Sequence, residues 1–147
     1  MKGLKKQLQN NEYNNVYLFY GEEKYLLDMY LKKLIDGLLV DTDPTMNYDY
    51  FDKSNMSVDK LFDAIETLPF FAERRVIVVS YAKLFKGKNN NSNIIADRIT
   101  DIPESTTVIF LEEEIDKRSK LYKLINKNGY VASFTKMSEN DLVKWVG

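Results

Sequence analysis

Carboxylates, lysines, tyrosines and backbone amides are the groups that could do chemistry in this chain of 147 residues, which has neither cysteine nor histidine. That absence excludes disulfides, Cys/His zinc sites, nucleophiles activated by histidine and a histidine pH switch. The most concentrated remaining group is the acidic run Glu112, Glu113 and Glu114, with Asp116 just beyond it. Together with Lys24, these carboxylates could serve a Mg²⁺-dependent enzyme acting on nucleotides or phosphates. The structural alternative is an acidic turn in contact with water.

A glycine between a predicted strand and a predicted helix marks the position where many α/β proteins bind phosphate. Gly21 holds this place, followed by Glu22 and Glu23. Carboxylates at the positive end of a helix are favourable by about 0.3–1 kcal/mol each, and they would repel a triphosphate. A Walker A loop needs Gly, Lys and then Ser or Thr five to seven residues after the first glycine. The chain has other residues there, namely Leu26, Leu27 and Asp28.

The acidic residue that a nucleotide-hydrolysing fold carries after its third strand is also missing. Residues 76–79 form the apolar run, and Ser80 and Tyr81 follow it where an Asp is expected. A surface position explains Lys24 better than a substitute for the Walker lysine does. We therefore predict an NTPase-like scaffold with no ATP site, no cofactor, no metal and no catalytic residue.

An apolar connection precedes the third predicted strand. Connections are usually polar because they cross the surface, yet Leu68, Phe70 and Phe71 lie together here around Pro69. One interpretation places both rings in the core beneath the sheet. The other makes the three apolar side chains a surface anchor that fills a pocket on a partner protein. In that case polar residues would surround the anchor, namely Glu73, Arg74 and Arg75.

Five short apolar runs predict the strands that position these residues. Three are continuous and rich in β-branched or aromatic residues, which is typical of strands buried on both faces. The runs are 16–20, 48–51, 76–79, 106–111 and 130–134.

Between the runs, apolar residues recur at helical spacing. The stripes are Leu27, Leu31, Leu34 and Leu38; Val58, Leu61, Phe62 and Ile65; Ile94, Ile95 and Ile99; and Leu121, Leu124 and Ile125. The candidate N-caps are Ser57, then Asn91 or Ser92, then Asp116 or Ser119. Strands alternating with helices predict an α/β fold with a mostly parallel five-stranded sheet and helices on both faces.

The charge balance is close to neutral. The chain has 21 Lys plus Arg against 22 Asp plus Glu, a formal net charge of −1, which argues against a domain that wraps nucleic acid. A nucleic-acid module could still use the basic helix with Lys117, Arg118, Lys120 and Lys123, although a basic helix with an apolar opposite face is more often a solvated surface. The N-terminus lacks the apolar segment of a secretory signal, and no apolar run is long enough for a membrane span. We expect a cytoplasmic protein.

Two segments depart from the alternating pattern. Residues 86–93 form a polar, asparagine-rich loop that we expect to be mobile and exposed. In residues 138–147, Ser138 and Asp141 resemble a capping box, and Leu142, Trp145 and Val146 then begin an apolar stripe. We expect residues 1–147 to be one N-terminal domain of a longer, three-domain protein, with residues 138–147 starting the helix to the next domain.

These pieces, in order and spacing along nearly the whole chain, resemble the N-terminal domain of the delta subunit of the bacterial DNA polymerase III clamp loader. The matching stretches are residues 16–27 and 68–79, with weaker support from residues 116–121 and 142–146. The resemblance implies a degenerate, AAA+-like P-loop domain that does not bind ATP. In this family a hydrophobic element just before the third strand binds the sliding clamp and helps to open the ring.

Carried over residue by residue, that element is Leu68, Phe70 and Phe71. The resemblance implies as partners the sliding clamp (beta) and the other loader subunits (gamma/tau and delta-prime), which would bind mainly through further domains. DNA contact would be weak or indirect, and no membrane is involved. The domain would take part in DNA replication within the polymerase III holoenzyme, a nucleotidyltransferase complex, and would have no catalytic site of its own.

Overall fold

Five parallel strands form one sheet in the order β2-β3-β4-β1-β5. The computed structural model describes residues 15–39, 47–55, 57–67, 74–85, 90–103 and 105–134. Along the chain, the strands are β1 (Val16–Tyr20), β2 (Tyr48–Asp52), β3 (Arg75–Ser80), β4 (Thr106–Glu112) and β5 (Tyr130–Ser133). The predicted α/β fold with a five-stranded parallel sheet is confirmed.

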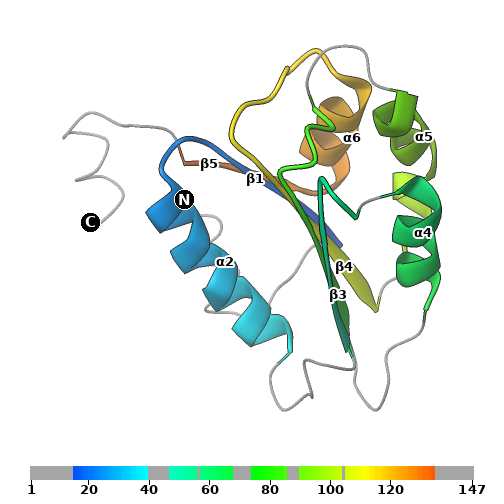
Figure 1. The fold of residues 1–147 in the computed structure, drawn as a ribbon, viewed down its shortest axis with the longest axis horizontal. Helices are drawn as coiled ribbons and strands as arrows, with labels where there is room; N and C mark the ends of the chain where they lie inside the picture. The colour runs from blue at the N-terminus through cyan, green and yellow to red at the C-terminus, as the bar shows by residue number, and fades with distance from the viewer. Residues whose placement is uncertain are drawn as a thin grey trace.

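Helices cover both faces of the sheet, also as predicted (Figure 1). One face packs against α2 (Lys24–Leu38). The opposite face packs against α4 (Val58–Glu66), α5 (Asn90–Arg98) and α6 (Lys120–Asn128), and the 3₁₀ turn η1 (Ile99–Asp101) follows α5. Two apolar cores result, one on each side of the sheet.

Strand β1 shows why the apolar runs form strands here. Tyr17 and Phe19 point into the core beneath α2, while Val16 and Leu18 point into the core beneath α4, α5 and α6. All four side chains are buried. Because both faces of the strand are covered, a continuous apolar run is needed rather than an alternating one.

The predicted helical stripes and caps agree with the structure in most places. Leu27, Leu34 and Leu38 are the side chains of α2 that point toward the sheet and are buried. Ser57 caps α4, with its hydroxyl accepting the Lys60 N–H at 3.1 Å. Of the two candidate caps for α6, Ser119 is the one that acts, through the Tyr122 N–H at 3.2 Å.

The segment before the fourth strand differs from the prediction. Helix α5 begins at Asn90, inside the stretch expected to be a loop up to residue 93, so neither candidate cap stands at its start. Ile95 and Ile99 are buried and Ile94 is exposed, which means that the inward stripe is shorter than expected. Burial of Ile95 and Ala96 against the core compensates for the low helix propensity of the asparagines.

Two predicted features lie outside the described residues. They are residues 86–89 of the polar loop and the apolar stripe in residues 138–147. Within the described part of the chain, no helix combines the length and the apolar character needed to cross a membrane.

Candidate functional site

The phosphate-loop position lies between β1 and α2, and its backbone amides are engaged by the protein itself. The Gly21 N–H donates to the Glu112 carbonyl at 3.1 Å, and the Glu23 N–H donates to the Phe134 carbonyl at 2.8 Å. The Lys24 N–H donates to the Glu22 carbonyl at 3.0 Å. Phosphate binding at a helix N-terminus needs such amides to point at the ligand. Three of the amides in this turn are therefore already used.

Gly21 has a structural reason to be glycine. Its φ is +141°, and a Cβ there would lie 2.3 Å from the carbonyl carbon and oxygen of Phe134. The chain leaving β5 thus passes directly against this turn. Close approach of two backbones explains the glycine without a phosphate.

Lys24 does not take the place of a Walker lysine in this arrangement. Its ammonium lies 5.4 Å from the centre of the Tyr81 ring, a cation–π contact between the start of α2 and the end of β3. The Lys24 side chain therefore stabilises the packing of the two elements.

Glu112, the first residue of the acidic run, is buried rather than presented as a metal ligand. It is 3% exposed, and its two carboxylate oxygens accept the backbone N–H groups of Lys83 and Leu84, each at 3.2 Å. Tyr81 and Lys83 both have positive φ, +52° and +60°, which is uncommon for residues other than glycine. The Glu112 carboxylate therefore holds the sharp turn that follows β3. Glu113 and Glu114 are exposed.

Negative charges surround Tyr81 at this edge of the sheet, where the carboxyl ends of the strands lie. The pKa of the Tyr81 phenol is raised, first by burial and then by the negative charges of Asp28, Glu113 and Glu112. A field that disfavours a phenolate also disfavours a nucleotide phosphate. This edge is where α/β proteins with an open sheet usually bind ligands.

The interpretation of these residues as a Mg²⁺ enzyme receives no support from the geometry. Asp116 forms a salt bridge with Arg118 at 3.1 Å, and hydrogen bonding to Arg118 lowers the pKa of its carboxyl. Glu112 is committed to backbone amides, and Lys24 to Tyr81. In the described ranges no group of three acidic side chains could hold a metal ion.

The basic residues considered for nucleic-acid binding are exposed on or near α6. Two of the four form ion pairs, Arg118 with Asp116 and Lys120 with Asp97. These pairs reduce the positive field that a phosphate backbone would meet. The arrangement is that of a solvated surface on which basic side chains on or near α6 meet acidic partners from α5 and from the turn before α6.

The candidate anchor formed by Leu68, Phe70 and Phe71 lies outside the described residues, but both ends of its connection are described. Helix α4 ends at Glu66, and Thr67 follows it in an extended conformation. Strand β3 begins at Arg75.

Side chains from three elements satisfy the final carbonyls of α4. The Thr67 hydroxyl donates to the Asp63 carbonyl at 2.7 Å, and the Thr106 hydroxyl donates to the Ile65 carbonyl at 3.3 Å. Between them, the Arg75 Nε donates to the Ala64 carbonyl at 3.1 Å. The Ala64 carbonyl also accepts the backbone N–H of the C-cap residue Thr67 at 3.3 Å, and together these bonds fix the end of the helix against the sheet.

Arg75 corrects one expectation. It was predicted at the polar rim of the anchor, but it is 8% exposed and its guanidinium forms a salt bridge with Asp49 on β2. Arg74, its neighbour, is half-buried. An arginine is almost never buried to this depth without a partner, and the partner here is 26 residues away in the sequence, where no local pattern reveals it.

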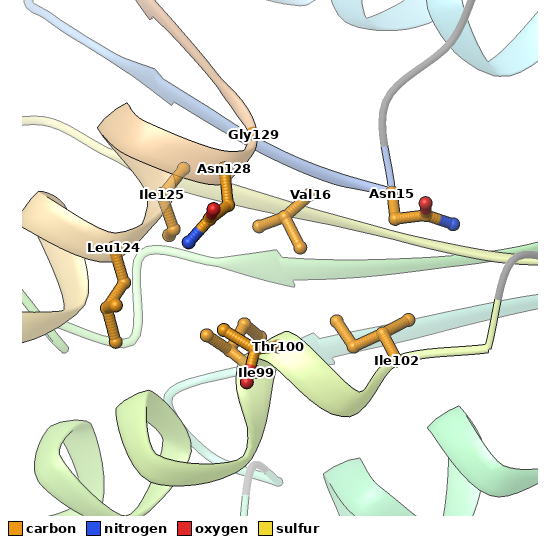
Figure 2. Close-up of a pocket in the computed structure, with 9 residues that line it drawn as sticks. All are labelled: Asn15, Val16, Ile99, Thr100, Ile102, Leu124, Ile125, Asn128 and Gly129. Carbon is orange, nitrogen blue, oxygen red and sulfur yellow. The ribbon is translucent and has the colours of Figure 1, made fainter.

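A pocket that the sequence did not predict lies at the opposite edge of the sheet, where β1 begins. Its volume is about 200 Å³, and Figure 2 shows side chains from β1, η1 and α6 around it. The lining residues carry no charge, so they offer nothing to balance the charge of a nucleotide. They are Asn15, Val16, Ile99, Thr100, Ile102, Leu124, Ile125, Asn128 and Gly129.

The family model and the curated relative that match this chain agree on one family. The family described as "DNA polymerase III, delta subunit" matches residues 17–135. The DNA polymerase III subunit delta of Bacillus subtilis is 27% identical in an alignment of 134 residues that covers 86% of this chain and 39% of that protein. This chain therefore spans well under half the length of that relative.

Solved structures show the same fold. The Bacillus subtilis DNA clamp loader delta protein superposes with a TM-score of 0.86 at 23% identity, over 98% of this chain and 45% of that one. A DNA polymerase III gamma subunit-related protein from Thermotoga maritima has a TM-score of 0.65 at 12% identity, covering 97% of this chain and 49% of that one. A RuvB variant from Thermotoga maritima has a TM-score of 0.51 at 11% identity, covering 96% and 44%. The predicted AAA+-like fold is confirmed.

Proposed function

The chain belongs to the DNA polymerase III delta subunit family, and from this premise we propose that it is the clamp-binding part of a cytoplasmic clamp-loader delta subunit. In this proposal Leu68, Phe70 and Phe71 dock in an apolar pocket on the sliding clamp and help to open the ring for loading onto DNA. The domain itself holds no ATP. It acts as the first domain of a longer protein, whose other domains bind gamma/tau and delta-prime.

The observation that carries the proposal is the apolar connection between α4 and β3. Three large apolar side chains stand within four residues, between a helix whose last residue, Glu66, is exposed and a strand that begins at Arg75. Fully burying two phenylalanines on a partner would contribute roughly 3–6 kcal/mol before the cost of association. A few such residues can dominate an interface.

Two further features support the absence of ATP. The amides of Gly21 and Glu23 are used by the carbonyls of Glu112 and Phe134. Negative charges surround Tyr81 at the same edge of the sheet. Both features oppose the binding of a triphosphate.

The test is direct binding of the purified chain to the immobilised sliding clamp of the same organism, measured by biolayer interferometry. We expect Phe70→Ala or Phe71→Ala to weaken binding by about 30-fold, as expected for central interface residues. Tyr25→Ala is the matched control, because Tyr25 is an aromatic residue that is 81% exposed on α2. Urea denaturation of each variant separates loss of binding from loss of the fold.

Failure of the unaltered chain to bind the clamp would refute the proposal. The alternative assignment of the rings to the core would follow if both phenylalanine variants lost stability while the remaining folded protein bound normally.

A further inference from the structure

One buried side chain joins the two ends of the connection that carries the proposed anchor. The Arg75 Nε donates to the Ala64 carbonyl, eleven residues earlier in the last turn of α4, at 3.1 Å. The same guanidinium pairs with the Asp49 carboxylate on β2 through Nη2. Its own backbone N–H donates to the Ser105 carbonyl, just before β4, at 2.8 Å. Arg75 thus connects α4, β2 and the start of β4 at a single point.

The burial of Arg75 makes these bonds significant for stability. Its side chain is 10% exposed, whereas that of Asp49 is 34% exposed. Solvent and salt screen such a pair less than they screen a surface pair, and removing either partner leaves a charge without compensation. The positive guanidinium also lies at the negative end of the α4 dipole.

A connection with fixed ends has fewer conformations to lose when it binds. The cost of ordering a loop is part of the cost of association, and fixing the loop ends in advance reduces it. Here the fixed points lie on either side of residues 68–73 and are joined by one arginine.

We propose that Arg75 is a positioning residue for the clamp contact: through Ala64 and Asp49 it holds together the two ends of the anchor-bearing connection, which are the end of α4 and the start of β3. This inference rests on the proposed function. Arg75 itself touches no partner in this proposal and acts only through the connection.

The experiment measures association and dissociation rates on the immobilised sliding clamp for Arg75→Met, Arg75→Lys and Asp49→Asn. We expect Arg75→Met to raise the dissociation constant about tenfold, mainly through faster dissociation, because a preformed arrangement is lost after contact. Arg75→Lys keeps the charge but not the two-pronged geometry and should recover part of the loss. Asp49→Asn removes only the ion pair and should lie between the unaltered protein and Arg75→Met.

Arg118→Met is the matched control, since it also removes an arginine–aspartate pair, but one whose arginine is 89% exposed. It should bind the clamp like the unaltered protein. Hydrogen exchange tests directly whether Arg75 holds the ends of the connection in place. Without the clamp, the amides of Thr67 and Arg74 should exchange faster in Arg75→Lys than in the unaltered protein. With the clamp bound, they should exchange at the same rate in both proteins.

The possible outcomes separate the two proposals. If the unaltered chain does not bind the clamp, the proposed function fails. If it binds and the phenylalanine variants lose binding, but folded Arg75→Lys and Asp49→Asn bind with unchanged rates, the function stands and the positioning role is refuted. Lower stability in urea without any change in dissociation rate would likewise show that Arg75 serves the fold alone.

Discussion

The buried carboxylate of Glu112 accepts the backbone N–H of Leu84, 28 residues earlier, with Oε2 and N 3.2 Å apart. Its other oxygen accepts the N–H of Lys83 at 3.2 Å. An acidic residue at the end of a strand, in a fold related to nucleotide-binding proteins, suggests metal chemistry when only the sequence is read. Here the carboxylate serves the backbone of a turn.

Replacing Glu112 with Gln should therefore destabilise the protein. A glutamine offers one oxygen acceptor and turns an NH₂ group toward the second backbone N–H, which leaves a buried donor unsatisfied at a cost of about 1–3 kcal/mol. Urea denaturation of Glu112→Gln measures this loss, and Glu113→Gln, at an exposed position, should change stability by less than about 0.5 kcal/mol. Equal stability of the two variants would contradict the role assigned to Glu112.

Gly21→Ala should also destabilise the fold. An added Cβ would meet the Phe134 backbone at 2.3 Å and would require a φ of +141° from an L-residue, so we expect a loss of about 1–3 kcal/mol. Gly37→Ala is the control, because Gly37 lies in the last turns of α2 without a positive φ. There, alanine should stabilise by about 0.5–1 kcal/mol. A neutral Gly21→Ala would mean that this approach of the two backbones is loose.

The phenol of Tyr81 should titrate above its ordinary value. Burial and the charges of Asp28 and Glu113 raise its pKa in the folded protein, so the neutral phenol is favoured on folding. The stability that follows is complete below the unfolded pKa of about 10 and is lost as the pH rises through the higher folded value. The difference in phenolate absorbance between the unaltered protein and Tyr81→Phe isolates this group.

Glu113→Gln removes one of the negative charges near Tyr81 and should lower that pKa toward its ordinary value. A Tyr81 titration that Glu113→Gln leaves unmoved would show that the field at this edge of the sheet is weaker than proposed.

ATP with Mg²⁺ should leave the thermal stability of the chain unchanged. A ligand present at one hundred times its dissociation constant stabilises the folded state by about 2.7 kcal/mol, which a thermal-shift titration detects readily. A concentration-dependent rise in the melting temperature would refute the ATP-free proposal. A rise with Mg²⁺ alone would instead support the carboxylates as a metal site.

The sequence predicted those strands and helix caps whose signal lies within a single short segment. The run that became β4 is apolar on both faces because helices cover both, and the caps Ser57 and Ser119 lie where a hydroxyl meets the first free amides. Helix α5 was missed at its start because tertiary burial of Ile95 outweighs the weak propensity of asparagine.

The charged residues of the candidate sites were harder to place for a different reason. Arg75 is buried because Asp49 lies on the neighbouring strand, and Glu112 because the turn after β3 presents two amides to it. Such partners are distant in sequence, and spacing along one segment carries no sign of them. The anchor predicted from Leu68, Phe70 and Phe71 lies outside the described residues and stays a prediction.

The contact between the turn at Gly21 and the carbonyl of Phe134 has a consequence for protein engineering. Grafting a lysine and a serine onto the start of α2 would supply the side chains of a phosphate loop, but the Glu23 amide would stay bonded to the Phe134 carbonyl after β5 and the Gly21 amide to the Glu112 carbonyl at the end of β4. An engineered phosphate site at this position would therefore also need the chain after β5 to follow a different path.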